Sequence, residues 1–136
     1  MDTDVIVAAM RSPAGASAAI VRAVRQGHVT MLLSVPLAME YESVCGRPQH
    51  REASGLSRHQ VEIVVDAVIA IGEPVPTHFL WRPQVHDPND EMVLEAAVNG
   101  RADALVTFNV RDYGTAAAQF GVEVLLPRDT IARIKR

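Results

Sequence analysis

Four things are scarce in this 136-residue sequence: aromatic residues, cysteine, lysine and long apolar runs. Aromatic residues make up 4% of the chain, so its core must be built from valine, alanine, leucine and isoleucine. The single cysteine, Cys45, excludes an internal disulfide and a cysteine-based zinc site. No apolar run reaches the ~20 residues of a transmembrane helix, and no signal peptide is recognisable. We therefore expect a cytoplasmic protein with no membrane partner.

Positive charge is also limited, since the net charge is −3. The chain therefore has no global basic field to attract nucleic acid, although a local basic rim can border an acidic centre. Lys135 is the only lysine, and the remaining basic residues are arginines, which form bidentate contacts with phosphate. Codon bias in a GC-rich genome is the simpler and favoured explanation of the arginine excess.

The length and apolar content of the chain predict a single domain spanning residues 1–136. Apolar residues make up 49% of the chain, which is enough for a single core. Short apolar runs of strand type alternate with helical patterns, which indicates an α/β fold with a parallel sheet covered on both faces. The strands are expected at Val29–Ser34, Ala104–Phe108 and Val122–Leu126.

The helical patterns carry recognisable boundary signals. Apolar spacing predicts a helix over Ala16–Gln26 and another that begins near Pro36. Ser57 and Gln60 form a capping-box pattern ahead of the next helix, whereas the polar stretch Gln49–Gly55 is expected to be a loop. Three further expectations are an N-cap at Asp129, an extended Glu73–Pro76 segment, and either a strand or a helix start over Val5–Met10.

Acidic residues fall near the strand-to-helix transitions. Asp2, Glu40, Asp90 and Asp112 would meet at one edge of a parallel sheet, where ligands bind outside the carboxyl ends of strands. Each has a structural alternative. Asp90 suits the first turn of a helix capped by Asp87, Asp112 suits a cap, Asp2 suits a solvated terminus and Glu40 suits an exposed helix face.

Clustered carboxylates have a chemical consequence. Oxygen ligands without thiolates suit a hard cation such as Mg²⁺ or Mn²⁺, and the five histidines show no metal-ligand spacing. Such a cation removes the repulsion among the acids, activates water and stabilises charge on a phosphoryl group. The cluster therefore predicts metal-assisted hydrolysis of phosphodiesters.

Four short motifs carry a resemblance to a known family. They are Asp2–Val5 (DTDV), Ser34–Tyr41 (SVPLAMEY), His86–Glu91 (HDPNDE) and Thr107–Tyr113 (TFNVRDY). No single motif is specific, but their order and spacing resemble those of PIN domains. The closest likeness is to the toxin-like PIN ribonucleases of bacterial toxin–antitoxin pairs.

The resemblance implies a three-layer α/β/α sandwich with a central parallel sheet and an Mg²⁺- or Mn²⁺-dependent endoribonuclease that cleaves RNA. It also implies a homodimer that is silenced by a cognate antitoxin. By position, the metal-binding and catalytic acids are Asp2, Glu40, Asp90 and Asp112. The auxiliary residues are Asp4, Asp87, Thr107 and Asn109.

Two departures from the family pattern are visible. Asp4 stands where asparagine is usual, which adds a charge near the metal. Only Met1 precedes Asp2, so we expect the first, central strand to be truncated. Two other functions stay open: a non-catalytic PIN-like protein that binds RNA or a partner, and a phosphoacceptor domain. A phosphoacceptor domain needs a lysine directly after a late strand, whereas Lys135, the only lysine, lies at the C-terminus.

Overall fold

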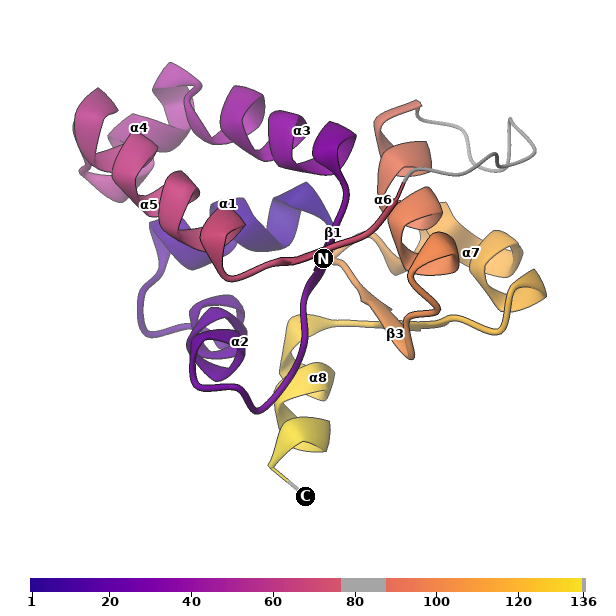
Figure 1. Ribbon diagram of the computed structural model, residues 1–136. Helices are drawn as coiled ribbons and strands as arrows, with labels where there is room; N and C mark the ends of the chain where they lie inside the picture. The colour runs from indigo at the N-terminus through magenta and orange to yellow at the C-terminus, as the bar shows by residue number, and fades with distance from the viewer. Residues whose placement is uncertain (77–87, 136) are drawn as a thin grey trace.

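Short parallel strands and a majority of helix make up the computed structural model, which describes residues 1–76 and 88–135 (Figure 1). The helices are α1 (Thr3–Arg11), α2 (Ala16–Arg25), α3 (Val35–Cys45), α4 (Pro48–Ser54), α5 (Arg58–Ala70), α6 (Pro88–Asn99), α7 (Val110–Gln119) and α8 (Pro127–Ile134). The strands are β1 (Leu32–Leu33), β2 (Glu73–Pro74), β3 (Ala104–Val106) and β4 (Glu123–Leu125). The α/β class expected from the alternating pattern is confirmed.

The strands form two separate parallel pairs rather than one sheet. Leu32 aligns with Glu73 in the β1–β2 pair, and Ala104 aligns with Glu123 in the β3–β4 pair. A single central sheet is therefore not seen in the described part of the chain, and the three-layer sandwich stays a prediction. In Figure 1, α1, α3, α4 and α5 gather beside one pair, while α6 and α7 lie beside the other.

Between the two pairs lies a groove of about 380 Å³, and Met1 is part of its wall. Its walls are mainly apolar and include Leu32 of β1 and Leu105 of β3. The N-terminus lies between the two strand pairs in Figure 1. Asp2 donates its backbone N–H to the carbonyl of Val106 at 2.9 Å, which joins this end of the chain to β3.

The segment that follows Asp2 is a helix, which settles the ambiguity over Val5–Met10. Asp2 has extended backbone geometry, and its Oδ1 accepts the Thr3 N–H at 2.7 Å as an N-cap. A cap of this kind fixes where a helix begins. Val5 and Ile6 are buried, so α1 packs as an internal helix, and it contacts α2 and α3.

Two local expectations are wrong. The polar stretch Gln49–Gly55 is largely helical, because α4 starts with Pro48 at its first position and ends at Gly55, whose φ of 74° suits glycine. This helix has no buried residue, so it shows no apolar stripe in the sequence. Asp129 lies in the first turn of α8, whose N-cap is Leu126.

Other local expectations are confirmed. Gln60 donates its N–H to Ser57 Oγ at 3.2 Å, and Ser57 donates its N–H to Gln60 Oε1 at 2.8 Å, which completes the capping box of α5. On α3, Leu37 and Tyr41 are fully buried, as their helical spacing predicted. Within the described segments, no single helix is long and apolar enough to cross a membrane.

Candidate functional site

An open pocket of about 560 Å³ brings acids from three helices together. It is lined by Asp2 and Asp4 at the start of α1, Glu40 of α3 and Asp90 of α6. Three of the four predicted metal acids therefore share one cavity with the predicted auxiliary residue Asp4. These acids come from three separate stretches of sequence, and the packing of α1, α3 and α6 places them along one cavity wall.

Asp2 is held through both of its carboxylate oxygens. Its side chain is only 6% exposed, and its Oδ1 is engaged by the Thr3 N–H. Its other oxygen, Oδ2, accepts the hydroxyl of Thr107 at 2.7 Å, and Thr107 itself is fully buried. The end of β3 thus fixes the orientation of an acid that lies 105 residues away in the sequence.

Asp4 lies beside Asp2 and contacts the loop after β3. Its Oδ2 accepts the Phe108 N–H and the Asn109 side-chain amide, both at 3.1 Å. Its Oδ1 is buried without a hydrogen-bond partner in the described structure. Burial, and then the charge of Asp2, raise the pKa of Asp4 from 3.8 to about 6. The pair is therefore poised to gain from a nearby positive charge.

A buried tyrosine reaches the acids from α7. Tyr113 is 1% exposed and donates its hydroxyl to Asp90 Oδ1 at 3.3 Å. Burial, followed by the charges of Asp2 and Asp90, raises the pKa of this phenol well above its ordinary value, so it stays a proton donor. Sequence analysis missed this hydrogen bond, because Tyr113 follows polar residues and no sequence pattern shows which carboxylate a buried hydroxyl meets.

Other predicted residues lie elsewhere. Asp112 is exposed on α7 and is not part of the pocket lining, and its backbone N–H donates to the Asn109 carbonyl. Asp87 lies outside the described residues. The structure thus brings Asp2, Glu40 and Asp90 together, whereas the role of Asp112 stays a prediction.

Basic side chains also line this pocket. They are Arg11, at the end of α1, and His50, on α4. Burial, and then the charges of Arg11 and Arg47, lower the pKa of His50 below its ordinary value, which favours the neutral imidazole. The cavity therefore combines carboxylates with the positive charge of Arg11, an arrangement that suits a metal ion next to an anionic ligand.

Comparison with protein families identifies the family of the chain. A family model of the PIN domain matches residues 1–111. The chain belongs to the PIN-domain family. PIN domains are generally metal-dependent nucleases, so the chain is assigned a nuclease-type hydrolase function at this level. No curated protein and no solved structure matches it. The match ends at Arg111, one residue before Asp112.

The PIN-domain assignment implies a divalent cation, and the donor atoms of the pocket fit one. The partnerless Asp4 Oδ1 and the close carboxylates of Asp2 and Asp4 supply hard oxygen ligands whose mutual repulsion a cation would relieve. The side chains are not drawn into a closed cage: no three acidic, histidine or cysteine residues in the described ranges are grouped tightly enough to hold a metal ion. Glu40 and Asp90 would then complete the ligand set from the pocket wall.

Proposed function

We propose that this PIN domain is an endoribonuclease that uses Mg²⁺ or Mn²⁺, and that it is the toxin of a toxin–antitoxin pair. The observation that carries the proposal is the shared pocket of Asp2, Asp4, Glu40 and Asp90. Its residue types match the oxygen donors that both cations prefer, and the family is one of metal-dependent nucleases.

In this proposal the side chains have distinct roles. Asp2, Asp4, Glu40 and Asp90 would hold the cation, which supplies activation of water and stabilisation of charge on the phosphoryl group. Thr107 orients Asp2, and the amide of Asn109 orients Asp4. Tyr113 holds Asp90 from the buried side of the pocket. The pocket is open to solvent, so an RNA strand can enter without a large rearrangement.

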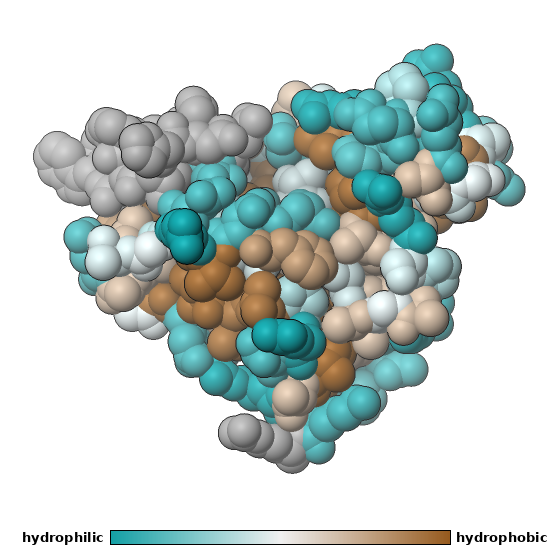
Figure 2. Space-filling model, turned by 180° about the vertical axis from the view of Figure 1, so that it is seen from behind, coloured by the Kyte–Doolittle hydropathy of each residue, from teal (hydrophilic) through white to brown (hydrophobic). Residues whose placement is uncertain are grey.

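Partner binding is the second part of the proposal. Val35 and Met39 are 71% and 63% exposed and lie one turn apart on α3, the helix that carries Glu40. Seen from behind, apolar residues also gather at the centre of one face of the molecule (Figure 2). Exposed apolar surface of this kind supports a homodimer contact or the docking of an antitoxin.

A single-stranded RNA substrate and a divalent-metal titration test the enzyme. Cleavage should require Mg²⁺ or Mn²⁺, should stop with a chelator, and should fall below detection in Asp90→Asn. The exposed acid Asp103, outside the acid pocket, gives the matched control Asp103→Asn, which should retain full activity. Asp112→Asn decides whether that exposed acid takes part.

The other candidate is a non-catalytic PIN-like protein that binds RNA or a partner. It is favoured by the position of Asp112 outside the pocket and by the absence of a closed metal cage within the described residues. Metal binding without cleavage of any RNA or DNA substrate would select this candidate and refute the ribonuclease.

A further inference from the structure

Four basic side chains around α4 lack acidic partners. They are Arg11, Arg47, His50 and Arg51, and none of them forms an ion pair with a carboxylate in the described ranges. The ion pairs seen there involve other cations: Arg58 and His59 with Glu62, and Arg133 with Glu123. Uncompensated positive charge is therefore concentrated at one place on the molecule.

Two atoms of this basic cluster lack partners that burial normally requires. His50 Nδ1 and Arg51 Nε are both buried and have no hydrogen-bond partner in the described structure. A buried polar atom left unpaired carries an uncompensated desolvation penalty, which is larger when the group is charged. An anion bound against α4 would supply the missing acceptor for Arg51 and neutralise the surrounding charge.

The basic cluster connects two cavities. Arg11 and His50 line the acid pocket, whereas Arg47 and Arg51 line a groove of about 720 Å³ between the end of α3 and α5. The proximity of the two sets is visible in the pKa of His50, which the charges of both Arg11 and Arg47 lower. A continuous cationic path therefore leads out of the acid pocket.

The same groove is also lined by acids from the neighbouring helices. Glu42 comes from α3 and Glu62 and Asp66 come from α5, and Glu62 lies 3.9 Å from Arg58. These carboxylates would repel an anionic strand, whereas Arg47 and Arg51 on the α4 side would attract it. The groove therefore gives one defined track, along α4, to a chain of phosphates.

We propose that Arg11, Arg47, His50 and Arg51 bind consecutive backbone phosphates of a single-stranded RNA whose scissile bond lies in the acid pocket. The inference rests on the proposed ribonuclease function, and it adds the route of the strand beyond the cleavage site. Arginine forks pair with phosphate oxygens, and such contacts position a strand without selecting its sequence. Single-stranded DNA should compete for this track, because the contacts do not involve the 2′-hydroxyl.

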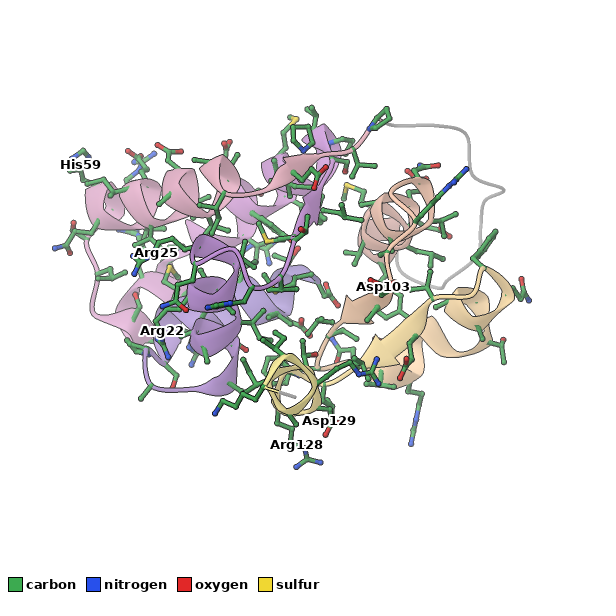
Figure 3. The ribbon with its side chains drawn as sticks, turned by 60° about the horizontal axis from the view of Figure 1, so that its bottom comes forward. Arg22, Arg25, His59, Asp103, Arg128 and Asp129 are labelled. Carbon is green, nitrogen blue, oxygen red and sulfur yellow. The ribbon has the colours of Figure 1, made fainter. Side chains whose placement is uncertain are left out.

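Binding is measured without cleavage, by fluorescence anisotropy of a labelled single-stranded RNA in the presence of a chelator. Arg47→Gln and Arg51→Gln should each weaken binding several-fold and lower the slope of log affinity against log salt by about 0.7 for each phosphate that is no longer neutralised. Arg25→Gln and Arg128→Gln are the matched controls. Figure 3 labels these exposed arginines, which belong to α2 and α8 and line neither the acid pocket nor the groove beside α4, so both variants should bind as the parent does.

The outcomes separate this inference from the proposed function. Arginine-dependent binding without cleavage at any metal concentration would support the track and refute the ribonuclease. Cleavage by a protein whose binding is unchanged in Arg47→Gln and Arg51→Gln would support the ribonuclease and refute the track. Equal weakening in the control variants, or competition by polyglutamate as strong as that by RNA, would also refute it. Circular dichroism confirms that each variant is folded.

Discussion

At the scale of single residues, the negative charge of Asp4 is costly to the metal-free protein. Its pKa is raised to about 6, so the folded state binds this proton more tightly than the unfolded chain does. Without metal, the contribution of Asp4 to the free energy of unfolding is therefore fully present below about pH 4 and is lost as the pH rises through 6. Asp4→Asn should therefore raise the unfolding temperature at neutral pH and flatten this dependence.

Thermal unfolding in chelator across the pH range checks the expectation for Asp4. Asp103→Asn, which removes an exposed charge elsewhere, should leave the profile unchanged. If Asp4→Asn were less stable than the parent at pH 7, the hydrogen bonds to Phe108 and Asn109 would matter more than the repulsion from Asp2. The same variant should bind Mn²⁺ more weakly, because it removes one carboxylate.

Thr107 differs from Asp4 because its buried hydroxyl has hydrogen-bond partners both as a donor and as an acceptor. Its hydroxyl donates to Asp2 and accepts the Asn109 N–H at 2.9 Å. Thr107→Val keeps the shape but leaves Asp2 with one partner fewer, and it should lower the free energy of unfolding by about 1–3 kcal/mol in urea titration. Thr107→Ser keeps the hydroxyl and should be destabilised less; similar destabilisation in both variants would assign the effect to packing.

The identity of the pocket acids was the most predictable part of the site. The sequence pattern placed Asp2, Glu40 and Asp90 at element boundaries, and all three line the pocket. The hydrogen bond of Tyr113 to Asp90 was not predicted, because nothing in a sequence shows which buried hydroxyl contacts which carboxylate. Asp112 was expected in the cluster, yet it points from an exposed turn of α7, a direction that depends on how the chain leaves β3.

At the scale of secondary-structure elements, α6 packs closely on the first strand pair. A Cβ built on Gly100, just past the end of α6, would lie 2.5 Å from Leu32 Cδ1 and 3.0 Å from Val75 Cγ2. Gly100→Ala should therefore lower the free energy of unfolding by about 1–3 kcal/mol, the usual cost of overpacking. Gly46→Ala is the comparison, since Gly46 has helical φ and its added Cβ would lie 3.3 Å from the Glu42 carbonyl, a milder contact; it should be destabilised less in chemical denaturation.

Helices whose sequence carries a capping motif or an apolar face were predictable. Elements that depend on contacts with distant parts of the chain were not. The capping box of α5 and the apolar face of α3 were evident because both depend on neighbouring residues. Helix α4 was missed because its residues are polar on all sides and its boundaries depend on Pro48 and Gly55. The strands are shorter than predicted, because an apolar run indicates which residues are buried but not which of them form backbone hydrogen bonds with another strand.

At the scale of the whole molecule, the groove between the strand pairs is the largest departure from a continuous sheet. The carbonyl of Val106 points into it and accepts the Asp2 N–H, as one rung of a parallel ladder would. An apolar extended segment fused ahead of Met1 should continue this ladder along β1 and β3. We expect a higher unfolding temperature and slower hydrogen exchange at the Val106 amide.

A flexible glycine–serine segment of equal length is the control for the fused segment. It has the same chain length but cannot fill an apolar groove, so it should leave both measurements unchanged. Equal stabilisation by the two segments would show that the groove selects neither apolar character nor extended geometry. Concentration-dependent stabilisation would instead point to strands exchanged between molecules.

The division into two strand pairs also has a kinetic consequence. The β3–β4 pair joins residues about 20 positions apart, such as Ala104 and Glu123, whereas β1–β2 joins residues about 40 positions apart, such as Leu32 and Glu73. Doubling a loop adds about 0.6 kcal/mol of closure entropy, so the C-terminal pair should form earlier. The acid pocket needs Asp2 and Glu40 from one half and Asp90 from the other. In stopped-flow refolding, recovery of Mn²⁺ binding should therefore lag behind the return of helical signal, as the final step of maturation.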